Sequence, residues 1–308
     1  MIDSEAQSGA VRDMVLASPR LTGFAGGRDA VQRMIDSIED AWLDIGGRRV
    51  HLDVHHAAEP RASIVFQPGS GAHARVYFLM AGLLARHGFN VLAIDRPGHG
   101  ASDGARGDCT IEEALAASAA AIGAAAARWR LPVVLMGSSM GGLLTVFGLL
   151  RGLQPDLAVA HNFVYPGKLA SFRLRAGWIR RYRTKPYALT KLVHNFATLS
   201  SDPAVIDYMT ARVDPAAAWE LSPRSVASMF AFNVKAPATS PPLLVVSGAK
   251  DKAIPASATR FFTWWSGLQG YDVEVLPGAG HLLFHDHLDV SLPLVREWLD
   301  LRLNRRRP

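Results

Sequence analysis

A serine stands between two glycines directly after a short apolar run, in Leu-Pro-Val-Val-Leu-Met-Gly-Ser-Ser-Met-Gly-Gly at residues 131–142. This Gly-x-Ser-x-Gly spacing is typical of a nucleophile elbow, where a sharp strand-to-helix turn exposes the serine hydroxyl. Gly137 and Gly141 would let the two backbone arms approach each other closely. An ordinary glycine-rich turn would fit the same motif, so the assignment of Ser139 as a nucleophile depends on its partners.

Two later segments supply those partners. A serine hydroxyl needs a base to remove its proton, usually a histidine that a carboxylate orients. Asp251 follows the apolar run 243–247 by four residues, and His281 follows the next such run, 271–276. Functional side chains collect at the carboxyl ends of parallel strands. The order Ser139, Asp251, His281 therefore predicts a nucleophile, an orienting acid and a base.

Acyl transfer also requires N–H donors that stabilise the developing oxyanion. The backbone N–H of Met140 follows the nucleophile at the start of a predicted helix. A second donor is expected from the glycine-rich turn Pro-Gly-Ser-Gly at residues 68–71, and we assign it to the N–H of Ser70. A simple connecting loop is the alternative interpretation of this turn.

A different chemistry, metal binding, is suggested by His281, His285 and His287. On a helix that begins near residue 285 the last two side chains would point in different directions, and the sequence offers no cysteine or carboxylate cluster to complete a ligand shell. We therefore expect neither a metal nor an organic cofactor. The single cysteine, Cys109, cannot form an internal disulfide and is expected to be a buried or capping thiol.

Strand-like and helix-like runs alternate from about residue 41, which predicts an α/β domain with a mostly parallel central sheet flanked by helices. The alternation stops near residue 166 and resumes near 224. We therefore expect an N-terminal extension (1–40), a core (41–165 and 224–308) and an inserted helical cap or lid (166–223). The expected strands are 41–45, 50–55, 63–67, 91–94, a run ending at 137, 157–164, 243–247 and 273–276. The expected helices are 29–37, 74–87, 111–129, 139–151, 225–232, 258–268 and 286–303.

Composition and charge limit the classes of function. The chain has 308 residues, of which 49% are hydrophobic and 19% charged, so a large buried core is expected. The net charge is +6, yet residues 157–201 alone hold eight basic residues and no acidic one. This segment is either a solvated helix face or a weak contact with anionic membrane surfaces; no nucleic-acid partner is expected. Without a signal-peptide pattern or a long apolar run, a cytoplasmic location is expected, and the oligomeric state stays open.

With these residues placed, the chain resembles the serine-nucleophile α/β-hydrolases, most closely the monoacylglycerol lipase/lysophospholipase-like group, over about residues 41–303. Three segments carry the resemblance: 68–77, 94–104 and 137–142. It implies an α/β-hydrolase fold and a hydrolase that cleaves carboxylic esters of mostly apolar acyl groups through an acyl-enzyme on Ser139. It also implies a structural role for the turn that holds Asp95 and His99. Pro68 stands where a His-Gly pair is usual in the family.

The cap resembles the family least. Phe172, Trp178, Tyr182 and Phe196 are expected to line an apolar substrate pocket, although a lid that packs against itself would explain them equally well. A small-molecule ester is the expected substrate. A thioesterase, peptidase or carbon–carbon hydrolase would use the same three residues. A different class, a ligand-binding or receptor-like hydrolase fold with incidental turnover, is the alternative.

Overall fold

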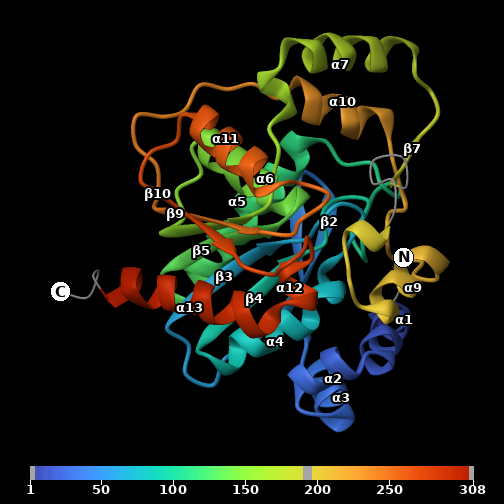
Figure 1. Ribbon diagram of the computed structural model, residues 1–308, viewed down its shortest axis with the longest axis vertical. Helices are drawn as coiled ribbons and strands as arrows, with labels where there is room; N and C mark the ends of the chain where they lie inside the picture. The colour runs from blue at the N-terminus through green and yellow to red at the C-terminus, as the bar shows by residue number, and fades with distance from the viewer. Residues whose placement is uncertain (1–3, 190–195, 305–308) are drawn as a thin grey trace.

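An eight-stranded sheet forms the centre of the computed structural model, which describes residues 4–189 and 196–304 (Figure 1). The strand order is β1-β2-β4-β3-β5-β6-β9-β10. Strand β2 is antiparallel to β1 and β4, and all other neighbours are parallel. The mostly parallel sheet predicted from the sequence is confirmed. The strands are β1 (Glu39–Ile45), β2 (Arg48–His55), β3 (Ala62–Gln67), β4 (Phe89–Ile94), β5 (Val133–Ser138), β6 (Leu157–His161), β9 (Leu243–Gly248) and β10 (Tyr271–Leu276).

Helices cover both faces of this sheet, because its central strands are apolar on both sides. Ile64 and Phe66 of β3 pack in a cluster with α4 (Phe78–Arg86) and α13 (Leu288–Asn304). Val65, between them, faces the opposite cluster with α5 (Ile111–Trp129). The same opposite face is covered by α6 (Met140–Leu150) and α11 (Ala256–Ser266) (Figure 1). The core is therefore two apolar layers with the sheet between them.

Three helices precede the sheet: α1 (Ser4–Ala17), α2 (Pro19–Ala25) and α3 (Arg28–Asp36). The sequence predicted only the third of them. Their buried side chains join the same apolar cluster as α4 and α13. The N-terminal extension is consequently part of the packed structure.

We call the segment between β6 and β9, which includes the predicted cap, the cap. Its helix α7 (Ala170–Tyr182) packs against α10 (Pro223–Ala231) through Ala176, Ile179 and Phe230 (Figure 1). The cap boundary predicted at residue 223 assigned α10 to the core, whereas α10 packs in one apolar cluster with α7. The other described cap elements are η2 (Pro166–Lys168), β7 (Tyr187–Ala188), η3 (Phe196–Thr198), α9 (Pro203–Ala211) and β8 (Glu220–Leu221). Residues 190–195 of the predicted cap lie outside the described residues.

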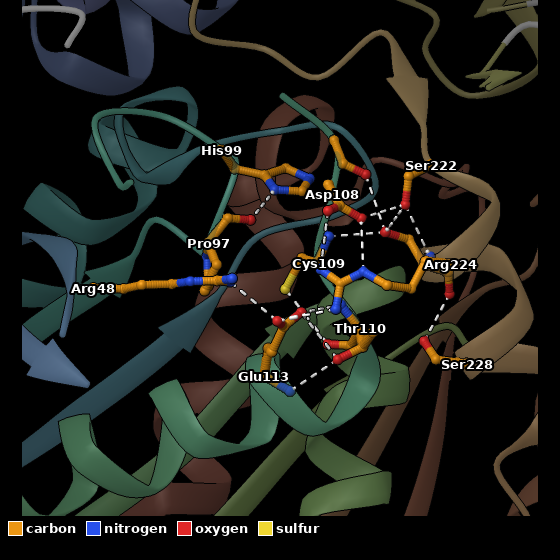
Figure 2. Close-up of polar contacts among 12 residues, drawn as sticks. Arg48, Pro97, His99, Asp108, Cys109, Thr110, Glu113, Ser222, Arg224 and Ser228 are labelled. Atoms are coloured by element: carbon orange, nitrogen blue, oxygen red, sulfur yellow. Dashed lines mark hydrogen bonds and ion pairs between the residues drawn. The ribbon is translucent and has the colours of Figure 1, made fainter. Parts of the chain in front are cut away.

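Polar contacts tie the end of the cap to the start of α5 (Figure 2). Arg224 forms ion pairs with Asp108 and Glu113, each at 3.0 Å. The backbone N–H of Cys109 donates to Ser225 Oγ at 2.8 Å. Within the described ranges, no helix is both long enough and apolar enough to cross a bilayer.

A charge network lies where β1, β2 and β4 meet, with His51, Asp53 and Asp95 buried and Asp40 at its exposed edge. His51 Nδ1 is 2.9 Å from Asp95 Oδ2, and His51 Nε2 is 2.8 Å from Asp40 Oδ1. Both ring nitrogens must donate to these carboxylates, so the imidazole is protonated. Asp40, His51 and Asp53 are close enough to share an ion. Arg75 already bonds both carboxylates of that group, at 3.1 and 2.8 Å, and fills the cationic position.

The pKa values follow this arrangement. Burial lowers the pKa of His51, but the hydrogen bonds to Asp40 and Asp95 outweigh it and raise that pKa to about 10. Burial raises the pKa of Asp95, and the His51 hydrogen bond and charge more than reverse this, to about 2. The stabilisation from His51 is therefore fully present below its unfolded pKa of about 6.5 and lost as pH rises through about 10.

We predict that the free energy of unfolding decreases as pH rises from 7 to 9, because the stabilisation from protonated His51 is progressively lost. In this window the folded protein keeps a proton that the unfolded chain releases, so the free energy of unfolding should fall by up to about 1.4 kcal/mol per pH unit from this group. Urea unfolding at pH 7, 8 and 9 measures the slope. His51→Gln should flatten it, whereas His56→Gln, at an exposed histidine paired with Glu39, should not. An unchanged slope in His51→Gln would contradict the assignment.

Candidate active site

Ser139 occupies the turn between β5 and α6 with φ of 55° and ψ of −113°. A Cβ atom on Gly137 would lie 2.1 Å from the carbonyl oxygen of Gly141, and one on Gly141 would lie 1.9 Å from that of Gln67. Neither position can accept a side chain. The Ser139 N–H donates to the His161 carbonyl at 2.8 Å, which fixes the turn against β6. This is the geometry of a nucleophile elbow.

The three residues predicted from distant parts of the sequence lie in one hydrogen-bonded chain. His281 Nε2 is 3.1 Å from Ser139 Oγ, and His281 Nδ1 is 2.8 Å from Asp251 Oδ2. Asp251 follows β9 and His281 follows β10, so the carboxyl edge of the parallel sheet brings them together. Both side chains are buried. With Nδ1–H donating to the carboxylate, the Nε2 lone pair faces the serine hydroxyl.

Asp251 is itself held by three donors. The N–H groups of Ala253 and Ile254 donate to Oδ1 at 2.7 and 2.8 Å. The side-chain amide of Asn162 donates to Oδ2, the oxygen that also accepts from His281. Asn162 is fully buried, directly follows β6 and has a left-handed φ of 40°. Asn162 was not predicted from the sequence, because the predicted strand ran on to residue 164 and this polar residue then fell inside the strand instead of at its carboxyl end.

A second buried histidine, His161, lies next to His281. The ring of His161 is 5.7 Å from that of His281 between centroids, and its Nδ1 is 3.0 Å from Ser138 Oγ. Burial lowers the pKa of His161 well below its usual value, and the charges of His281 and His285 lower it further. His161 is therefore neutral and adds no positive charge beneath His281.

The turn at residues 68–71 lies close to the elbow and is held from several sides. Arg96 donates to the carbonyl oxygens of Pro68 and Gly69 at 2.6 and 2.9 Å. Tyr77 Oη accepts from the Gly69 N–H at 3.1 Å, and Ala218 of the cap donates to the Gly71 carbonyl at 2.7 Å. No hydrogen bond between described residues uses the N–H of Ser70 or of Met140. Both N–H groups are therefore available to donate to a ligand oxygen.

Asp95 and His99 belong to a neighbouring turn and do not contact this chain of residues. Asp95 accepts hydrogen bonds from the N–H groups of Ala74 and Ala101, at 2.7 and 2.8 Å, as well as from His51. Burial, with the nearby charge of Arg96, lowers the pKa of His99 to about 3. These contacts fit the structural role that the family resemblance implies.

A cavity of about 140 Å³ opens beside Ser139 and His281. Its other walls come from the turn at 69–72, from η1 (Ala74–Tyr77), from the cap and from the N-terminal extension. Apart from the polar groups of Ser70, Tyr77, Ser139, Tyr208, Trp219, His281 and His285, the described side chains in the lining are apolar, and none of the described lining residues is acidic or a lysine or arginine. Cap and N-terminal residues in the wall include Leu189, Phe196, Leu199, Val205, Tyr208, Met209, Trp219 and Met14.

Of the four residues predicted to form the pocket, only Phe196 lines this cavity. Phe172 packs on Phe230 inside the cap, with ring centroids 4.8 Å apart. Trp178 and Tyr182 are 54% and 63% exposed. The prediction for these three is corrected: Phe172 packs with Ala176 and Ile179 against α10, and this packing leaves Trp178 and Tyr182 exposed.

The other two histidines considered as metal ligands, and the single cysteine, lie in separate environments. His285 Nε2 donates to the Val76 carbonyl at 3.2 Å in the wall of the cavity, and His287 Nε2 accepts from the Gly280 N–H at 3.0 Å. These two rings and His281 therefore point at different partners. Burial raises the pKa of the Cys109 thiol to about 12, so it is protonated at neutral pH.

Comparisons with known proteins identify lipases and an esterase among the proteins similar to this chain. A curated monoacylglycerol lipase from Mycolicibacterium smegmatis is 26% identical over 270 residues, which covers 80% of this chain and 91% of the relative. The crystal structure of a Paleococcus ferrophilus monoacylglycerol lipase is similar with a TM-score of 0.64 and 24% identity, covering 82% of this chain and 99% of that one. A Bacillus coagulans carboxyl esterase reaches a TM-score of 0.71 at 18% identity, covering 87% and 99%.

The family model described as serine aminopeptidase, S33, matches residues 58–287, which is well over half of the chain. The matched span holds the sheet from β3 to β10, the elbow, and the segments that bring Asp251 and His281 to it. The chain therefore belongs to the serine aminopeptidase, S33, family and has the α/β-hydrolase fold.

Proposed function

We propose that the protein is a serine hydrolase that cleaves carboxylic esters of mostly apolar acyl groups. Ser139 is the nucleophile, His281 the general base and Asp251 the acid that orients it. The observation that carries this proposal is the hydrogen-bonded chain from Ser139 to Asp251 at the edge of an apolar cavity. The substrate is a small-molecule ester.

In the first half of the reaction, His281 Nε2 takes the proton from Ser139 Oγ as that oxygen attacks the ester carbonyl carbon. The N–H groups of Met140 and Ser70 stabilise the oxyanion of the tetrahedral intermediate. The imidazolium then gives its proton to the leaving alcohol oxygen, and the acyl group stays on Ser139. Asp251 remains ionised and stabilises the imidazolium. Water attacks the acyl-enzyme with His281 again as base, which releases the acid and restores the hydroxyl.

The cavity favours an ester over the free amino terminus of a peptide. An aminopeptidase must bind a substrate ammonium group, and a buried ammonium without a paired charge is strongly unfavourable. The described residues that line the cavity include no carboxylate. The monoacylglycerol lipase relative supports the same choice.

Replacement of the proposed nucleophile gives the direct test. Ser139→Ala should abolish labelling by a fluorophosphonate probe and lower the hydrolysis of p-nitrophenyl esters by at least about 1,000-fold, since the base then has no hydroxyl to activate. Ser138→Ala is the matched control, because its hydroxyl contacts His161 instead of His281, and it should still be labelled. Full turnover in folded Ser139→Ala would reject the mechanism. A wild-type protein without labelling would favour a ligand-binding function.

Asn162 is proposed as a positioning residue for Asp251, and its side chain can be tested apart from its backbone. Asn162→Gly keeps the left-handed φ without strain while it removes the amide donor. We expect kcat to fall by about 10- to 100-fold with KM nearly unchanged, as for other groups that orient a functional side chain. Thermal unfolding should show a folded protein. A raised KM at constant kcat would instead indicate a role in substrate binding.

We also propose that the cap contacts anionic membrane surfaces through α7. Leu174, Trp178 and Tyr182 are 78%, 54% and 63% exposed, and their four-residue spacing places them on one helix face. The helix lies at the outer edge of the cap (Figure 1). Apolar and aromatic side chains among cations are typical of helices that lie in the membrane interface. The exposed cations of α7 are Arg173, Arg175, Arg180 and Arg181.

Vesicle sedimentation tests this contact. Wild-type protein should bind phosphatidylserine-containing vesicles, bind pure phosphatidylcholine vesicles more weakly, and lose binding at high salt. Trp178→Ala and charge reversal at Arg180 and Arg181 should each weaken binding several-fold. Trp264→Ala, at a tryptophan on α11 that is 66% exposed, is the matched control and should bind as the wild type does. Equal losses for the two tryptophan variants would contradict a specific role for α7.

A further inference from the structure

We propose that the N-terminal extension sets the length of the acyl group, because Met14 of α1 walls the cavity beside Ser139 and restricts it to chains of about six carbons. This inference rests on the proposed esterase function. It assigns a specificity-determining residue to a part of the chain outside the span that the family model matches, which begins at residue 58.

Helix α1 is fixed in place at both ends. Near its start, Ser8 Oγ accepts from Arg75 Nη1 at 2.5 Å, and Arg75 is buried and bonded to Asp53. Beyond its end, Ser18 Oγ donates to Asp202 Oδ2 at 2.5 Å. Ser18 caps α2 and Asp202 caps α9, so one hydrogen bond joins the starts of two helices. Met14 is therefore presented by a helix with defined attachments.

Packing directs this helix toward the cavity. Figure 1 shows α1 beside α9, and the two helices are in contact. Val11 and Val15 of α1 are buried in the same cluster as Val205 and Tyr208 of α9. Met14, only 5% exposed, lines the cavity together with Val205, Tyr208 and Met209. The extension and the cap thus share one apolar wall.

The volume and chemistry of the cavity indicate its occupant. An apolar cavity of about 150 Å³ accommodates benzene, a six-carbon ligand. The cavity here measures about 140 Å³ and includes Ser139, so a hexanoyl-sized acyl group would fill it. A longer chain must displace the wall. Methionine is the adaptable part of that wall because its side chain is flexible, and Met14 is the member supplied by the extension.

The length profile of ester hydrolysis tests this assignment. With p-nitrophenyl esters whose acyl groups have two to sixteen carbons, wild-type kcat/KM should peak at about four to eight carbons. It should be at least tenfold lower for the twelve-carbon ester, since one methylene too many in an apolar pocket changes kcat/KM by about 10-fold or more. Met14→Ala opens the wall, so the ratio of the twelve-carbon to the six-carbon rate should rise at least about tenfold. Met14→Phe fills the cavity and should move the peak to shorter chains.

Met34→Ala is the matched control. Met34 is also a buried methionine of the N-terminal extension, but it lies on α3, packs against Gly82 and does not line this cavity. Its variant should keep the wild-type profile. An unchanged profile in both folded Met14 variants, or an equal shift in Met34→Ala, would overturn the inference. Fluorophosphonate labelling separates the two proposals: an active, labelled enzyme with an unchanged profile rejects the role of Met14, whereas unlabelled, inactive wild-type protein rejects the esterase function.

Discussion

The site depends on the close approach of three backbone segments at the elbow. Gly137, Gly141 and Gly142 leave room for the carbonyl oxygens of Gly141, Gln67 and His161, each of which would lie within 2.3 Å of an added Cβ atom. These contacts pack the start of α6 against the ends of β3 and β6. The turn that holds Ser70 continues from β3, and Asn162 continues from β6. The nucleophile, the turn with a proposed oxyanion donor and the residue that holds Asp251 therefore all continue from this one close contact.

The cap and the turn at 68–71 share supports. His73 Nε2 is 2.7 Å from Asp214 Oδ2 with both side chains buried, and Tyr208 donates to the same carboxylate. Burial raises the pKa of Asp214, and His73 outweighs this and lowers it, so the carboxylate is ionised. Because the N–H of Ala218 also donates to the Gly71 carbonyl, the cap segment just before β8 is fastened to the turn that carries a proposed oxyanion donor. A movement of this part of the cap would disturb both the cavity wall and the donor.

The sequence was sufficient for features that local pattern and chain order determine. The central sheet was predicted because buried parallel strands are short apolar runs. The hydrogen-bonded chain from Ser139 to Asp251 was predicted because its members follow such runs. The contribution of α1 was missed, since only tertiary packing brings Met14 to the cavity. The residues of α7 were misplaced because large apolar side chains suggested that they line the pocket, whereas Phe172 packs inside the cap against α10 and Trp178 and Tyr182 are exposed.

The packing of α1 has a consequence for how such proteins are classified. A substitution at Met14 leaves residues 58–287 unchanged, so two proteins that differ there would match the same family model equally well. Substrate range can then diverge between copies of a gene while every residue around the elbow is retained. Transfer of substrate names by alignment of the core would fail for these proteins, and the segment before the first strand is the place to look for their differences.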